Sequence, residues 1–129
     1  MSQKPHRQAV YHPFVGMAGL PFSEAVEVGD LLFLCGQIGS DANGKLVAGG
    51  ITAQTRQTLA NIRAVLERHD SSLDRIVKVT VMLADIGEWA AMNAEYVAVF
   101  GKNLPARSAF GTNGLALGAR VEIECVAAL

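Results

Sequence analysis

The sequence lacks the excess of positive charge that a protein binding nucleic acid or an anionic membrane usually carries. Its 129 residues include 11 Lys and Arg against 12 Asp and Glu, a formal net charge of −1. Such a chain offers no electrostatic attraction to either partner. No apolar run approaches the roughly 20 residues that span a bilayer, and the N-terminal residues do not resemble a signal peptide. We therefore predict a cytoplasmic protein with no nucleic-acid or membrane partner.

Cysteine and histidine are scarce, which argues against a disulfide framework and against a metal site. The two cysteines, Cys35 and Cys125, lie in apolar runs typical of strands, so we predict free thiols. The histidines, His6, His12 and His69, do not have the spacing of metal ligands. The sequence has no P-loop, no GxGxxG motif before a helix, no HExxH and no CxxC. We expect neither a metal nor an organic cofactor.

Apolar residues, by contrast, are plentiful enough for one hydrophobic core. Half of the residues are hydrophobic and 18% are charged, which fits a single globular domain over residues 1–129. Proline and glycine recur in residues 1–18, so we expect this N-terminal segment to be irregular.

Hydrophobic periodicity predicts five strands and two helices in the rest of the chain. A period of two indicates strands, and apolar residues three or four apart indicate helices. The predicted strands cover 24–28, 31–38, 77–83, 107–113 and 120–129, and the predicted helices cover 51–68 and 87–100. This β-β-α-β-α-β-β order predicts an α/β fold of the α+β type, with both helices packed on one face of a mixed sheet.

The last predicted strand separates apolar side chains from acidic ones. Val121, Ile123 and Cys125 fall on one face, whereas Glu122 and Glu124 fall on the other. The acidic face therefore belongs to the side of the sheet opposite the helices.

That opposite face is polar for the middle of a sheet, because the strand over 77–83 adds Lys78 and Thr80 to it, interleaved with Met82. Two interpretations are open. The face is either solvated, which is the commoner arrangement in antiparallel sheets, or it is an interface between subunits of a closed oligomer.

One arginine and two glutamates are the candidate reactive groups. Glu122 and Glu124 lie about 6.5–7 Å apart on their face, a spacing that suits acid–base chemistry or a solvated surface. Arg107 follows Pro105-Ala106, and its guanidinium needs a partner if it is buried, because it cannot lose its charge. We expect its strand to pair with the last strand or to lie close to it. Arg107 then binds a structural carboxylate or a ligand carboxylate, and spacing does not decide between them.

Five ordered segments, from about residue 19 to residue 128, resemble one protein family. They are GLPFSEAVEVGDLLFLCGQIG, QTRQTLANIRAVLE, IVKVTVMLADIGEWAAMNAEY, LPARS and RVEIECVA. Together they resemble the Rid family, the YjgF-like or endoribonuclease L-PSP-like reactive intermediate deaminases. The resemblance implies a chorismate-mutase-like subunit in a homotrimer, with sites in the clefts between subunits. It also implies hydrolysis of an enamine or imine to a 2-oxo acid and ammonia, without a metal or cofactor.

The resemblance implies roles for individual residues as well. Arg107, in the PARS motif, is expected to bind the carboxylate of a 2-imino acid. Glu122, the first glutamate of the VEIE motif, is expected to orient and deprotonate the attacking water. Asn93 belongs to the same neighbourhood, and backbone groups at Gly36 and Ala109 are expected to supply further hydrogen bonds.

Three positions depart from the residues that the family often has, and all three make the expected site more apolar. Phe22 stands where tyrosine is frequent, Cys35 where serine is frequent and Ala109 where cysteine is frequent. The resemblance thus predicts a deaminase of the 2-iminobutanoate/2-iminopropanoate type. The alternative is a non-catalytic trimer that binds 2-oxo acids or regulates a partner. A larger or cyclic substrate would also suit an apolar pocket, whereas a ribonuclease would need a basic patch that the sequence lacks.

Overall fold

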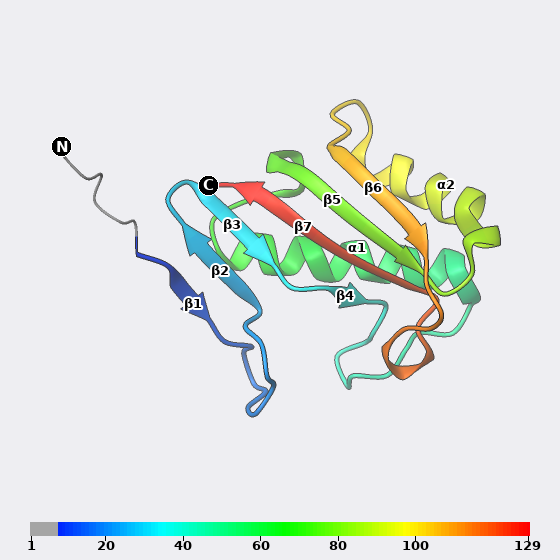
Figure 1. Cartoon of the computed structure of the whole chain (residues 1–129), viewed down its shortest axis with the longest axis horizontal. Coiled ribbons are helices and arrows are strands. Elements are labelled where there is room, and N and C mark those ends of the chain that lie inside the picture. The colour runs from blue at the N-terminus through cyan, green and yellow to red at the C-terminus, as the bar shows by residue number, and fades with distance from the viewer. Residues whose placement is uncertain (1–7) are drawn as a thin grey trace.

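A mixed sheet with helices on one face organises the chain in the computed structural model, which describes residues 8–129 (Figure 1). The strands are β1 (Val10–His12), β2 (Ala25–Val28), β3 (Leu31–Leu34), β4 (Gln37–Ile38), β5 (Ile76–Leu83), β6 (Ala106–Gly111) and β7 (Val121–Ala128). Their order in the sheet is β1-β2-β3-β7-β5-β6, and β4 also pairs with β7. The pair of β5 and β6 is parallel, and the other pairs are antiparallel.

Two helices, α1 (Gly50–Arg68) and α2 (Trp89–Phe100), cover the same face of the sheet and enclose one core. Short 3-10 turns lie at Leu73–Arg75, Ile86–Glu88 and Ala116–Gly118. Leu59 and Ile62 of α1 and Met92 of α2 meet Val79 of β5 and Ile123 of β7 in that core. The predicted fold class, with two helices on one face of a mixed sheet, is therefore confirmed. No helix among residues 8–129 is long and apolar enough to span a membrane.

Of the two expected positions for the strand of Arg107, pairing with the last strand is wrong and a position close to it is correct. β6 pairs with β5 alone, and β5 separates it from β7. The register nevertheless brings Arg107 level with Cys125, because both are opposite Val79 of β5. Hydrophobic periodicity identifies strands but does not encode which strands become neighbours, so this arrangement was not predictable from it.

The predicted strand 31–38 is interrupted at Cys35 and Gly36, and this break shapes the candidate site. Both pieces pair with β7: Phe33 is opposite Val126, and Gln37 is opposite Ile123. Four steps along β3 and β4 thus match three steps along β7, which makes the break a β-bulge. At the bulge the amide of Cys35 donates instead to the carbonyl oxygen of Glu24, at 3.0 Å.

Helix α1 fixes β4 behind this bulge. The side-chain amide of Asn61 donates to the carbonyl oxygens of Ile38 and Ser40, each at 3.0 Å. Between them, Gly39 approaches the helix so closely that a Cβ there would lie 2.7 Å from the carbonyl oxygen of Gln54. Gln54 itself is buried and accepts a hydrogen bond from the amide of Arg120 at 2.9 Å. Its polar side chain therefore faces the sheet.

Two smaller features also differ from the sequence-based expectation. β1 lies inside the N-terminal segment that was expected to be irregular, because tertiary pairing with β2 orders three residues there. The part of that expectation that concerns residues 1–7 lies outside the described residues.

Val77 is exposed rather than buried with Val79, since a register shift between Ile76 and Lys78 turns it away from the core.

We expect the substitution Gly39→Ala to destabilise the protein, because the added methyl group would clash with the backbone of α1. The cost should be about 1–3 kcal/mol in the free energy of unfolding, as for other overpacked positions. Chemical denaturation of the variant and the wild type measures it. Gly87→Ala is the matched control, because the new methyl group there meets mainly the exposed Asp85 side chain. An equal loss in both variants would contradict the close approach of β4 to α1.

Candidate functional site

Arg107 lies on the helix side of β6, against three side chains of α2. Its Nη1 donates to Oδ1 of Asn93 at 2.7 Å. Its guanidinium carbon lies 5.1 Å from the centre of the Trp89 ring and 4.7 Å from the centre of the Tyr96 ring. Positions 89, 93 and 96 are four and then three residues apart, so they share one face of the helix. We call these four residues the arginine cluster.

The arginine cluster holds a cation without neutralising it. Both aromatic faces attract the guanidinium, and Asn93 uses one of its five N–H donors. Among residues 8–129, no Asp or Glu forms an ion pair with Arg107. The hydroxyl of Tyr96 is buried without a hydrogen-bond partner in the same part of the chain. A positive group that is oriented but has no carboxylate partner can bind the carboxylate of a ligand.

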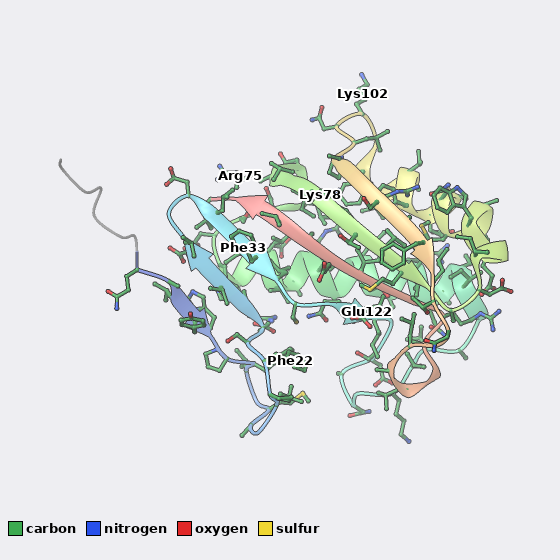
Figure 2. The ribbon with its side chains drawn as sticks, viewed as in Figure 1. Phe22, Phe33, Arg75, Lys78, Lys102 and Glu122 are labelled. Atoms are coloured by element: carbon green, nitrogen blue, oxygen red, sulfur yellow. The ribbon has the colours of Figure 1, made fainter. Side chains whose placement is uncertain are left out.

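Glu122 lies on the other face of the sheet, directly under the bulge. A Cβ at Gly36 would stand 2.0 Å from Oε2 of Glu122, so a larger residue there would force the carboxylate to move. Beside them is a cavity of about 450 Å³, which also contains Gln37. The rest of its wall is mostly apolar and comes from Phe14, Met17, Leu20, Phe22, Ile38 and Leu117. We call this cavity the glutamate pocket; Figure 2 labels Glu122 near β4, and Phe22 on the segment before β2.

The surroundings of Glu122 make its carboxyl group a stronger base than an exposed glutamate. Partial burial raises the pKa of Glu122, and the nearby charge of Glu124 raises it further. The charge of Glu124 and the desolvation of Glu122 thus both raise this pKa. A carboxylate with a raised pKa is suited to accept a proton from water near neutral pH.

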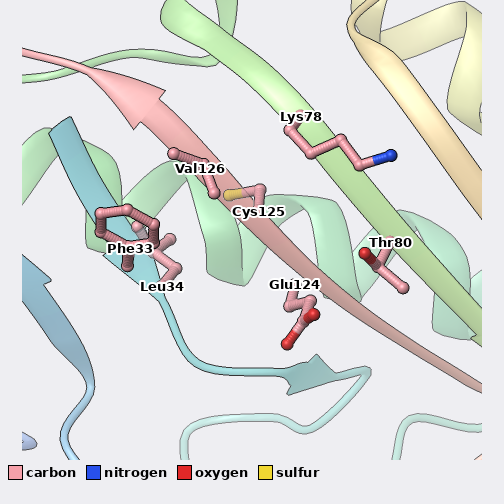
Figure 3. Close-up of a pocket in the computed structure, with 7 residues that line it drawn as sticks. All are labelled: Phe33, Leu34, Lys78, Thr80, Glu124, Cys125 and Val126. Carbon is pink, nitrogen blue, oxygen red and sulfur yellow. The ribbon is translucent and has the colours of Figure 1, made fainter.

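Glu124 itself faces a second, smaller cavity of about 230 Å³ on the open face of the sheet. Figure 3 shows this cavity where β3 leaves β7, with Phe33 from β3 and with Lys78 and Thr80 from β5. Phe33 and, further along the face, Phe110 of β6 are exposed. The open face is therefore a mixture of polar and large apolar side chains.

Arg107 and Glu122 do not meet within one chain. Paired residues of neighbouring strands point to the same side of a sheet, and Arg107 is opposite Val79 in the core. Glu122 is opposite Met82, three residues further along β5 and on the other side of the sheet. The two side chains thus belong to opposite faces, with two strand spacings between them, about 10 Å.

The remaining expected site residues divide between the two faces. Ala109 shares the helix side of β6 with Arg107 and packs against the core. Cys35 lies at the bulge, where its sulfur accepts a hydrogen bond from Nε2 of Gln37 at 3.6 Å. Burial, and to a lesser degree the charges of Glu24 and Glu122, raise the pKa of the Cys35 thiol to about 11. The thiol is therefore protonated at neutral pH and does not act as a nucleophile there.

Both cysteines are free, as predicted, and burial raises the pKa of Cys125 to about 12. In the part of the chain that the structure describes, no three His, Cys, Asp or Glu side chains form a group suited to a metal ion. What the two faces provide is a cation, a basic carboxylate and an apolar pocket. These groups can bind a carboxylate and activate water.

Comparison with known proteins identifies the family. A sequence model described as endoribonuclease L-PSP matches residues 17–129. The chain belongs to this family. The resemblance to Rid proteins that the five sequence segments indicated is thereby confirmed.

Relatives in the L-PSP family carry names of different specificity. Protein HMF1 of Saccharomyces cerevisiae is 43% identical over 111 residues, which cover 86% of this chain and 86% of that protein. A human protein named 2-iminobutanoate/2-iminopropanoate deaminase is 40% identical over 108 residues, covering 83% of this chain and 79% of its own. Its goat counterpart is 41% identical over the same length.

Solved structures of L-PSP relatives have the same fold. A Rid family protein from Yersinia pestis, described as of unknown function, superposes with a TM-score of 0.87 at 34% identity. The superposition covers 95% of this chain and all of that one. RidA from an Antarctic Psychrobacter superposes with a TM-score of 0.81 at 32% identity, over 98% of this chain and all of that one.

Sequence reasoning placed Asn93 near Arg107 but missed Trp89, Tyr96 and most of the glutamate pocket. The spacing of Trp89 and Tyr96 around Asn93 was a readable signal. Phe14, Met17 and Leu117 gave no signal, because they lie in segments without strand or helix periodicity.

We expect the carboxyl of Glu122 to titrate above its ordinary pKa of 4.5. Glu124→Gln should lower the pKa of Glu122, and the pKa should stay above 4.5 because desolvation is the larger cause. NMR titration of the side-chain carboxyl carbon measures both values. Glu67→Gln, on the exposed side of α1, is the control and should leave the pKa of Glu122 unchanged.

The raised pKa of Glu122 also predicts how the stability of the protein depends on pH. A carboxyl that holds its proton more tightly in the folded state loses stability when it ionises, so stability falls as pH rises through 4.5 toward the folded pKa. Glu122→Gln should therefore gain stability relative to wild type as pH rises from 4 to 7, measured by thermal unfolding. A difference that does not change with pH would contradict the raised pKa.

Proposed function

We propose that the protein hydrolyses reactive 2-imino acids to 2-oxo acids and ammonia, with Arg107 and Glu122 acting from two different copies of the chain. The observation that carries the proposal is an oriented arginine with no acidic partner in residues 8–129, combined with a basic glutamate beside a cavity. The deaminase names of relatives about 40% identical support the same reaction.

In the proposed site, Arg107 binds the substrate carboxylate. Its guanidinium has free N–H donors for a bidentate, charge-assisted pair, and Asn93, Trp89 and Tyr96 fix its orientation in advance. Such pre-orientation places the imine carbon without further loss of conformational freedom. Selectivity for imines that carry a carboxylate follows from the charge of Arg107.

Glu122 acts as the base that activates water. A protonated imine is already a strong electrophile, so the enzyme needs mainly a positioned water and a group that accepts its proton. The water oxygen forms a bond to the imine carbon while Glu122 takes one proton. Glu122 then returns that proton to the nitrogen. As the C–N bond breaks, the remaining hydroxyl proton passes to Glu122, which leaves the 2-oxo acid, and this proton departs with the released ammonia as ammonium. Hydrolysis by this route requires no metal, cofactor or redox partner.

The placement of the two residues on opposite faces supports a site between copies. A second copy that covers the open face of the sheet would also bury Phe33 and Phe110, which are exposed in one chain. In a closed ring, each copy contributes its arginine cluster to one neighbour and its glutamate pocket to the other. We propose the homotrimer that the family resemblance implies. A trimer that binds 2-oxo acids without turnover is the alternative.

We expect Arg107→Ala to lower kcat/KM for 2-imino acids by about 100-fold or more, because two charge-assisted hydrogen bonds are lost. Arg107→Lys should recover part of it, since lysine keeps the charge but not the planar fork. Imines are generated in situ with an amino-acid oxidase, surviving imine is trapped with semicarbazide, and its loss is followed. Arg63→Ala, on the exposed side of α1, is the control and should retain full activity. Undiminished turnover by Arg107→Ala would refute the assignment.

Subunit complementation tests whether each site spans two copies. Arg107→Ala and Glu122→Gln chains, each inactive alone, are co-expressed with different tags and purified as mixed oligomers. In a mixed trimer, which holds two copies of one chain and one of the other, one of the three sites receives both intact residues, so about one third of wild-type activity should return. Mixing Arg107→Ala with the double variant is the control, because no site then has an arginine. Inactive mixtures in both cases would place the two residues of each site on the same chain.

A further inference from the structure

The glutamate pocket has a more apolar wall than the hydrolysis of a small imine requires. Phe14, Met17, Leu20 and Phe22 line it from the segment before β2, and Leu117 lines it from the 3-10 turn before β7. Glu122 provides the charged group in the wall. A cavity of about 450 Å³ that is mostly apolar with few polar groups is typical of a small-molecule site.

Several of these side chains are exposed although they are apolar. Phe22 is 52% exposed, Met17 58% and Leu117 74%. Phe14 and Phe22 hold each other edge to face, with ring centres 5.6 Å apart, so the aromatic part of the wall is ordered rather than collapsed. Binding of an apolar ligand is favoured when it removes exposed apolar groups around a cavity from water.

Leu117 has an unusual backbone conformation at the edge of this pocket. Its φ of 58° lies in the left-handed region, where a residue other than glycine is disfavoured. Strained residues that persist in a fold are concentrated at binding sites. The conformation favours glycine, but the chain has leucine here, and the leucine side chain lines the pocket.

We infer that the glutamate pocket binds the side chain of the substrate, and that the preferred substrates are 2-imino acids with a branched aliphatic or aromatic side chain. This inference rests on the proposed function. The imine carbon has three substituents: the carboxylate, the nitrogen and the side chain. With the carboxylate at Arg107 and the imine carbon at Glu122, the side chain is the substituent that can fill the apolar volume.

The size of the preference follows from apolar contact. One methylene group in a hydrophobic pocket changes kcat/KM by about 10-fold or more. Imines derived from leucine and phenylalanine should therefore be hydrolysed with kcat/KM at least about 10-fold higher than the imine derived from alanine. The released ammonia and the reacting atoms are the same in all three, so only the side chain is compared.

Leu117→Gly tests the pocket wall without endangering the fold, since glycine adopts a positive φ without strain. It should reduce kcat/KM for the leucine and phenylalanine imines about 10-fold more than that for the alanine imine. Met17→Ala, at an exposed position, should act in the same direction. Val15→Ala is the matched control, because Val15 is a 77% exposed apolar residue of the same segment that does not line the pocket.

Binding of products provides a readout that does not depend on turnover. Calorimetry should show tighter binding of 4-methyl-2-oxopentanoate and phenylpyruvate than of pyruvate, and Leu117→Gly should remove the difference. Equal or weaker binding of the larger acids, or a preference for the alanine imine, would overturn the inference and leave the deaminase proposal standing. Tighter binding of the larger acids, without hydrolysis of any imine, would support the pocket and refute the deaminase.

Discussion

The alternation of side chains along β5, β6 and β7 is the constraint on which the rest of the site depends. Because successive residues of a strand point to opposite faces, the register that buries Val79, Ile123 and Cys125 fixes every other side chain of these strands. It turns Arg107 toward α2 and Glu122 toward the open face. One chain therefore carries the two candidate groups on opposite faces, where no side-chain rotation can bring them together, and this geometry supports the proposed shared site more strongly than any surface feature does.

The bulge at Cys35 and Gly36 is a second constraint on the site, because it determines how closely the chain passes Glu122. A Cβ at Gly36 would lie 2.0 Å from Oε2 of Glu122, so glycine at the bulge lets the chain pass the carboxylate without displacing it. The close packing also removes water from the carboxylate, which raises the pKa of Glu122. Asn61 and Gly39 hold the following residues against α1, so the packing of β4 on this helix contributes to the burial of Glu122.

Most of the fold, but only part of the candidate site, could be predicted from the sequence. Both helices, the acidic face of β7 and the fold class follow from periodicity, because burial on one face imposes it residue by residue. The neighbour of β6 does not follow from it, nor do the bulges that expose Val77 and interrupt 31–38, because pairing is a property of two segments. Residue type and spacing made Arg107 and Glu122 candidates, and only the family motifs assigned them roles. The apolar wall was not found, since Met17 and Leu117 lie in segments whose conformation is set by what they contact.

The division of the proposed site between two copies separates two sources of selectivity. Charge at Arg107 discriminates for a carboxylate, and its strength depends on Asn93 and the aromatic faces of α2. Apolar contact in the glutamate pocket discriminates by size, and there phenylalanine at position 22 replaces the hydroxyl that the family often has. A hydrogen-bonding pocket rejects an unmatched substrate more strongly than an apolar one does, because its buried polar groups are left without partners. Under the proposed function, phenylalanine at this position therefore widens the range of side chains accepted, while the carboxylate requirement, which comes from Arg107 of the other copy, is untouched.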